Sequence, residues 1–338
     1  MDWSIIFEDG LRTAFGIIAA VYALTAVGLN LQFGYTGLMN YGQAGFVLVG
    51  AYGMAIFIYE VPSLEVGGVD LSLPVGFLIG CLCAVVLGLI LGIPTLRLRG
   101  DYLAIVTISA AEILRITTNS RAAQDVTGGP QGKRFASGFF DVNPFDGRFK
   151  LFGAVAFSAN TLWVMVWTWG LVAICSVAMF LLMRSPWGRA LKAVREDEDA
   201  ARALGKNVYA YKMQSLVIGG VIGGMAGMML ALSRQFVEPD AFQSSITFLA
   251  YAALILGGLA RIFGPILGSM LLWFVIAASE SFLSEAVEHG FLGIDNVITS
   301  DDIGPVRFML VGLLIMLLVI FRPQGILGDR QEVMLGND

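Results

Sequence analysis

Long apolar runs dominate this sequence, and they decide what kind of fold the chain can adopt. The runs approach the ~20 residues that cross a bilayer as a helix. Of the 338 residues, 57% are hydrophobic and only 14% are charged, whereas soluble domains carry about a quarter charged residues. Because a bilayer offers the backbone no hydrogen-bond partners, such runs span it as helices. The sequence therefore predicts an all-α, polytopic transmembrane helical bundle that forms a single domain over residues 1–338.

The apolar runs and the polar stretches between them divide the chain into successive parts. In order, these are four spans within 14–118, an external connection at 119–159, span five at 160–183, a loop at 184–212, the remaining spans within 213–321 and a tail at 322–338. One run, at 244–259, is short for a full crossing. It is either a steep helix or a re-entrant segment, so we expect eight or nine spans.

The placement of basic residues orients the bundle. If the loop at 184–212 is cytoplasmic, the short outer connections at 60–73 and 284–305 contain no Lys or Arg, as the positive-inside rule requires. The connection at 119–159 carries five basic residues, but long loops are translocated largely regardless of charge. We therefore predict an N-terminus outside the membrane and a cytoplasmic C-terminus.

No catalytic or metal-binding constellation is evident in the sequence. The three cysteines fall inside apolar runs, and the single histidine, His289, has no ligand cluster around it. A phosphate-binding loop is missing as well, because Gly132-Lys133 is followed by Arg134 and Gly205-Lys206 by Asn207. We expect a protein that is not an enzyme, binds no metal, cofactor or nucleic acid, and does not hydrolyse ATP itself.

Polar residues at membrane depth are costly and therefore invite a functional interpretation. Thr36, Asn40 and Gln43 lie in a glycine-rich segment at 34–45 that opens the second span. Irregular backbone at membrane depth is tolerated when it is buried in protein or lines a cavity, so these residues are candidates for lining a pathway, although a plain interfacial loop fits equally well. Glu112 is a further candidate, but Arg115 follows three residues later and can neutralise it on the same helix face.

The loop at 184–212 is the longest polar stretch, and its residues predict two short helices. Ser185 and Asp197 are suited to cap them, Pro186 suits a first helical position, and Gly205 suits a left-handed end. The first helix has a narrow apolar stripe and a basic face; the stripe consists of Trp187, Ala190, Leu191 and Val194, and the basic face of Arg189, Lys192 and Arg195. Such a helix either docks in a partner's groove or rests on the membrane surface.

One motif in this loop favours docking. Asp199-Ala200-Ala201, followed after three residues by Gly205, resembles the Glu-Ala-Ala-x-x-x-Gly loop of ABC-importer permeases, with Asp where Glu is commoner. Further segments resemble the branched-chain amino acid ABC-permease family, most closely its LivM-type subunit. They are 28–31, 34–37, 42–44, 96–102, 112–115, 127–132, 185–190, 257–258, 264–268 and 322–325.

The resemblance implies a permease subunit in the cell membrane of a prokaryote that imports branched-chain or other small amino acids. It implies four kinds of partner: ABC ATPase subunits, a second homologous permease subunit, an extracytoplasmic solute-binding protein and the lipid bilayer. The coupling element to the ATPase would comprise Arg195, Asp199, Ala200, Ala201 and Gly205. Relatives carry urea or short amides, so these solutes are an alternative, and an ion-coupled secondary transporter is a second, less favoured one.

Overall fold

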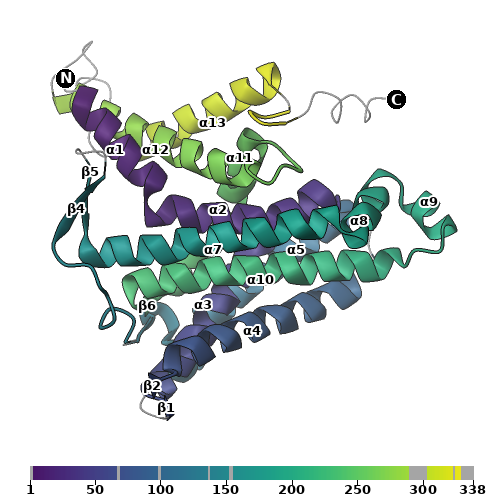
Figure 1. Cartoon of the computed structure of the whole chain (residues 1–338), viewed down its shortest axis with the longest axis horizontal. Coiled ribbons are helices and arrows are strands. Elements are labelled where there is room, and N and C mark those ends of the chain that lie inside the picture. Colours follow the sequence, from purple (N-terminus) through teal and green to yellow (C-terminus); the bar gives the residue numbers. More distant parts are fainter. Residues whose placement is uncertain are drawn as a thin grey trace.

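The computed structural model describes residues 3–66, 69–97, 100–135, 138–151, 155–288, 303–322 and 324–328. Helices form most of this part of the chain, and the long ones run side by side (Figure 1). Two short helices extend beyond one end of the bundle, whereas most of the short strands gather at the other end. We call these the α8–α9 end and the strand end. His289 and residues 329–338 of the predicted tail lie outside the described residues.

The elements follow one another along the chain as a series of helices with short hairpins between them. The α-helices are α1 (Trp3–Phe15), α2 (Ile17–Leu29), α3 (Gln43–Glu60), α4 (Ser72–Thr95), α5 (Gly100–Thr118), α6 (Gln124–Thr127), α7 (Ala159–Arg184), α8 (Pro186–Glu196), α9 (Glu198–Ala203), α10 (Val208–Arg234), α11 (Ser245–Gly257), α12 (Gly264–Glu288) and α13 (Ile303–Phe321). A π-helical turn, η1 (Asn30–Tyr35), extends α2, and 3-10 turns form η2 (Arg121–Ala123), η3 (Gly129–Gln131) and η4 (Pro239–Phe242).

The strands form three antiparallel pairs. They are β1 (Glu65–Val66) with β2 (Val69–Asp70), β3 (Lys133–Arg134) with β6 (Phe236–Val237), and β4 (Arg148–Leu151) with β5 (Val155–Ser158). The β3–β6 pair matters most for the arrangement, because it ties the connection after α5 to the segment between α10 and α11.

Seven helical segments of the described chain are long and apolar enough to cross a membrane. They are Ile17–Tyr35, Gln43–Glu60, Ser72–Thr95, Ala159–Arg184, Val208–Arg234, Pro239–Gly257 and Gly264–Val287. The predicted all-α polytopic bundle is therefore confirmed. α5 and α13 lie where further spans are expected from the sequence, and the total of eight or nine stays a prediction, as does the sidedness of the two ends.

A helix ahead of the first span is the main departure from the sequence-based expectation, which began the first span at residue 14. α1 is separate because Gly16 is extended, with φ −67° and ψ 174°. It packs along α12, where Phe7 meets Phe274 edge-to-face at a centroid distance of 5.7 Å. The acidic residues Glu8 and Asp9 hide this helix from a search for apolar runs.

α10 is the central helix of the bundle and packs against α2, α3 and α4. Its glycines allow a very close approach to α3: a Cβ on Gly50 of α3 would lie 2.5 Å from the Cα of Gly224, and a Cβ on Gly227 would overlap the carbonyl oxygen of Val47. Small residues at such spacing are what lets helices associate in lipid, where apolar burial alone gives no driving force.

We expect Gly227→Ala to destabilise the bundle, because the added methyl group meets backbone that must move. Overpacking of this kind costs roughly 1–3 kcal/mol. Gly170→Ala on α7 is the matched control, since a Cβ there meets nothing within 4 Å. Thermal unfolding of the purified protein in detergent measures both; equal midpoints for the two variants would contradict the close packing of α3 on α10.

Candidate functional site

The loop between α7 and α10 folds as the sequence predicts. Ser185 accepts a hydrogen bond from the Gly188 N–H at the start of α8. Asp197 begins α9 by accepting hydrogen bonds from the N–H groups of Asp199 and Ala200 at 2.9 and 3.0 Å. Gly205 follows with φ +73°, the left-handed conformation that glycine adopts without steric penalty. The predicted caps and the glycine end are thus confirmed.

α9 presents one face to the bundle and one to solvent. Ala201 is buried against Val194 of α8 and Val208 of α10, so it holds the two short helices to the membrane-spanning part. On the opposite face the Asp199 side chain is 89% exposed and Leu204 is 78% exposed, with Ala200 exposed between them. The motif residues therefore divide into a buried anchor and an exposed surface.

Ion pairs hold α9 in place. Arg202 pairs with Asp199 at 2.8 Å and with Glu198 at 3.4 Å, and Glu198 also pairs with Lys212 near the start of α10. Exposed pairs of this kind contribute little stability each. Together they fix the direction in which α9 extends from the α8–α9 end (Figure 1).

α8 lies directly on the break between the first two spans. The Cγ atom of Arg195 would be 3.4 Å from a Cβ on Gly37, and the Lys192 ammonium lies 6.0 Å from the centre of the Tyr35 ring. The Arg195 side chain is exposed overall, but its aliphatic part lies against Gly37 in the segment at 36–42. The five residues of the implied coupling element thus have three different surroundings. Arg195 lies against Gly37, Ala201 is buried, and the others are exposed, namely Asp199, Ala200 and Gly205.

The segment at 36–42 and its neighbours form a buried polar cluster, which we call the junction. Thr36 is hydrogen-bonded to Ser215 of α10 at 2.7 Å. Asn40 donates to the side-chain oxygens of Gln32 at 2.9 Å and Gln43 at 3.2 Å. The amide nitrogens of Gln32 and Gln43 donate in turn to backbone carbonyls of α10, those of Leu216 and Gly219.

The junction residues are almost completely shielded in this conformation. Gln32, Asn40 and Gln43 are 0% exposed and Thr36 is 2% exposed. The structure therefore brings three of the predicted pathway residues together with Gln32, which the sequence suggests to be an interfacial residue because it lies at the end of the first span. In this conformation these four side chains lie in a packed interior, and their polar atoms are hydrogen-bonded to one another or to α10.

Two further helices are hydrogen-bonded to the junction. The Tyr41 N–H donates to the Thr107 hydroxyl of α5 at 3.1 Å, and the Ala44 N–H donates to the Thr247 hydroxyl of α11 at 2.9 Å. The Tyr251 hydroxyl donates to the Asn40 carbonyl at 3.0 Å. α2, α5, α10 and α11 therefore all meet at the junction.

Glu112 lies apart from the junction, on an open groove between α5 and the start of α11. Arg115 contacts it at 2.6 Å, which confirms the pair predicted from the spacing, and Arg115 also contacts Asp240 of η4 at 2.7 Å. The groove has a volume of about 600 Å³ and is lined in addition by Ser109 and Ser244. Asp240 gave no signal in the sequence, since 125 residues separate it from Arg115.

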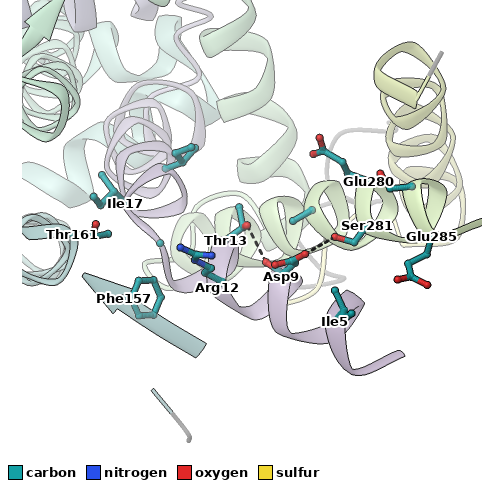
Figure 2. A pocket seen from close by; sticks show the side chains of 14 residues that line it. Ile5, Asp9, Arg12, Thr13, Ile17, Phe157, Thr161, Glu280, Ser281 and Glu285 are labelled. Atoms are coloured by element: carbon teal, nitrogen blue, oxygen red, sulfur yellow. Dashed lines mark hydrogen bonds between the residues drawn. The ribbon is translucent and has the colours of Figure 1, made fainter. Parts of the chain in front are cut away.

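A second hollow, of about 680 Å³, lies between α1 and α12 near the start of the chain (Figure 2). Asp9 accepts a hydrogen bond there from Ser281 at 2.9 Å. Glu280 pairs instead with Arg307 of α13, and Glu280 and Glu285 point to different sides of α12 (Figure 2). Its acidic groups therefore do not converge on one point, as a binding site for a single cation would require. Among the residues that the structure describes, no group of three or more His, Cys, Asp or Glu has a metal-binding arrangement.

Comparison with known proteins finds relatives among transport permeases. A family model described as "Branched-chain amino acid transport system / permease component" matches residues 13–321. The high-affinity branched-chain amino acid transport system permease protein LivM of Escherichia coli K12 is 32% identical over 335 residues, which cover 95% of this chain and 71% of the relative. The probable LivM permease of Methanocaldococcus jannaschii is 26% identical, over 92% of this chain and 91% of the relative.

A second kind of permease also matches. The E. coli K12 protein LivH, named as a permease of the same high-affinity system, is 27% identical over 79% of this chain and 84% of its own length. No solved structure matches the chain.

The hydrogen bonds of the junction lead to a stability prediction. Asn40→Leu removes the donor to Gln32 and Gln43 and the acceptor for the Gly42 N–H. Each buried partner left unpaired costs about 1–3 kcal/mol, so we expect a clear fall in the thermal midpoint in detergent. Asn160→Leu is the control, because Asn160 only accepts an exposed hydrogen bond from Asn143 at the strand end. A midpoint for Asn40→Leu as high as that of the control would contradict the structural role of the junction.

Proposed function

The chain belongs to the family of branched-chain amino acid transport system permease components, and from that premise we propose that it is the membrane-spanning subunit of an ATP-driven importer. The single observation that supports this most is the exposed surface of α9, which extends past the bundle with Asp199, Ala200 and Leu204 unburied. An exposed short helix that is fixed by ion pairs is suited to sit in a groove of another protein. The sequence has no phosphate-binding loop, so ATP hydrolysis falls to that partner.

The proposed assembly contains ABC ATPase subunits at the α8–α9 end, a second homologous permease subunit in the membrane and a solute-binding protein at the strand end. Relatives named LivM and LivH are both similar to this chain, which supports a pair of permeases of the same fold. In this assembly the α8–α9 end is cytoplasmic, the N-terminus is outside and the bundle has eight or nine spans. The solutes are branched-chain or other small amino acids, with urea or short amides as the alternative.

The contacts of α8 suggest how ATPase movement reaches the spans. Ala201 anchors α9 to α8 and α10, and Arg195 of α8 lies against Gly37 at the edge of the junction. A displacement of α9 by its partner is passed through α8 to the junction, and from there to α5 and α11. We propose that alternating access arises in this way. Of the four candidate pathway residues, Glu112 already faces an open groove, whereas Thr36, Asn40 and Gln43 would line the route only when the junction rearranges.

Ion-coupled secondary transport is less well supported. It calls for a buried acidic group that binds the coupling ion, yet Glu112 is partly exposed and is paired with Arg115 at 2.6 Å. Uptake driven by a proton or sodium gradient in proteoliposomes without an ATPase would favour this alternative.

We expect Ala200→Trp to abolish coupling while leaving the fold intact. Because Ala200 is exposed, the chain itself can accommodate the larger side chain, whereas a partner seated on α9 would clash with it. ATP-driven uptake in proteoliposomes and co-purification of the ATPase should both fall by tenfold or more, equivalent to at least ~1.4 kcal/mol of binding free energy.

Ala122→Trp provides the matched control for ATPase co-purification and for folding, since Ala122 is also exposed but lies in η2, away from the α8–α9 end. The thermal midpoints of both variants should equal that of the unmodified protein. Unchanged uptake and ATPase co-purification for Ala200→Trp would overturn the coupling role of α9.

A further inference from the structure

α1 lies almost entirely ahead of the residues that the family model matches. The matched part begins at residue 13, whereas α1 runs from Trp3 to Phe15 and packs along α12. Trp3 and Phe7 contact phenylalanine rings of α12 but are still 67% and 57% exposed. α1 is therefore a peripheral helix of the described bundle, and its exposed rings suit contact with lipid.

Tryptophan side chains place the end of α1 at the surface of the membrane. Trp163, Trp167 and Trp169 lie near the start of α7, at the strand end (Figure 1), and tryptophan is enriched where lipid headgroups meet water. The Trp169 indole donates to the carbonyl oxygen of Phe15, the last residue of α1, at 2.8 Å. The hollow between α1 and α12 is lined by Thr161, which lies just before Trp163 on α7. The hollow is therefore at headgroup depth.

The hollow carries two separate charges of opposite sign on α1. None of the ion pairs between described residues includes Arg12, which extends toward the β5 side of the hollow, whereas Asp9 points toward α12 (Figure 2). Asp9 accepts a hydrogen bond from Ser281 through Oδ2, and a carboxylate has further lone pairs for a second donor. Glu280, by contrast, is already paired with Arg307. Because Asp9 and Arg12 are one helical turn apart, roughly 4.5 Å along the axis, they match a ligand that carries a cation close to an anion.

Apolar side chains form the membrane side of the same hollow. Ile17 and Ile18 begin α2 directly after the break at Gly16, and Ala277 lines the hollow from α12. The charged groups belong to α1 and the apolar ones mainly to the start of the first span, so the hollow changes from polar to apolar toward the membrane interior. A volume of about 680 Å³ divided in this way fits the headgroup and the upper acyl chains of a lipid.

We propose that this hollow binds a phospholipid of the leaflet at the strand end, one whose headgroup joins a phosphate to a primary ammonium group, as in phosphatidylethanolamine. The Arg12 guanidinium donates to the phosphate, which its planar fork suits well, and the headgroup ammonium donates to Asp9. A trimethylammonium group has no N–H to donate, and an anionic headgroup would set a second negative charge beside Asp9. The acyl chains follow Ile17 and Ile18. The site requires only that the bundle spans a membrane, so it goes beyond the proposed importer.

Photo-labelling of the full chain in detergent tests this site. The probe is a phosphatidylethanolamine with a diazirine in the upper part of one acyl chain, and mass spectrometry locates the adducts. We expect adducts on peptides that contain Ile17, Ile18 or Ala277. Unlabelled phosphatidylethanolamine should suppress them at a roughly tenfold lower concentration than phosphatidylcholine or phosphatidylglycerol with the same acyl chains, as the loss of one charge-assisted hydrogen bond predicts. Equal suppression by the three lipids, adducts spread evenly over the exposed faces of α4 and α7, or suppression by inorganic phosphate alone would overturn the proposal.

Two substitutions separate the roles of the two charges. Arg12→Gln should lower labelling of the hollow roughly tenfold, because the phosphate loses a charge-assisted contact. Asp9→Asn should keep the labelling but abolish the preference for the primary ammonium group, because asparagine can still accept from Ser281 but carries no charge. Arg121→Gln is the matched control, since Arg121 is exposed in η2 and does not line the hollow.

The thermal midpoints of all three variants in lipid-free detergent should equal that of the unmodified protein, so that a loss of labelling reports the site and not the fold. Labelling of Arg12→Gln as strong as that of Arg121→Gln would overturn the phosphate contact. An unchanged headgroup preference in Asp9→Asn would overturn the ammonium contact. Neither result bears on the coupling role of α9, which Ala200→Trp tests separately.

Discussion

The hydrogen bonds of Asn40 are the interaction on which the rest of the structure depends. The chain leaves helical geometry after η1 and resumes it at Gln43, so backbone and amide groups of the intervening segment must be paired inside the bundle. Asn40 joins Gln32 to Gln43, and both glutamines then reach carbonyls of α10. Because all of these groups are uncharged, the junction avoids the large desolvation penalty of buried ions.

The same network explains why distant parts of the chain are positioned together. α8 contacts the junction through Arg195, α5 through Thr107, and α11 through Tyr251. α10 carries both the acceptors of the network and the glycines that bring α3 close. The exposed surface of α9, which is proposed to bind a partner, and the groove beside α5 are thus attached to one hydrogen-bonded centre.

Local signals in the sequence were sufficient for the short helices but not for the tertiary arrangement. Ser185, Asp197 and Gly205 act within a few residues of themselves, so their roles as caps and as a helix end were predictable. The Glu112–Arg115 pair follows equally from helical spacing. Asp240 was missed because its partner Arg115 lies 125 residues away in the sequence. Gln32 was missed because its place at the end of the first span suggested an interfacial side chain, and α1 because its charged residues interrupt the apolar pattern that identifies spans.

The contrast between the junction and the groove bears on where a solute passes. Opening a route through the junction would separate Thr36 from Ser215 and Asn40 from both glutamines, and each hydrogen bond lost without a replacement costs about 1–3 kcal/mol. Widening the groove beside Glu112 breaks none of these bonds, since it is already open on one side. In the proposed importer, movement of the junction as a unit, with α5 attached to it through Thr107, is therefore the less costly way to change access.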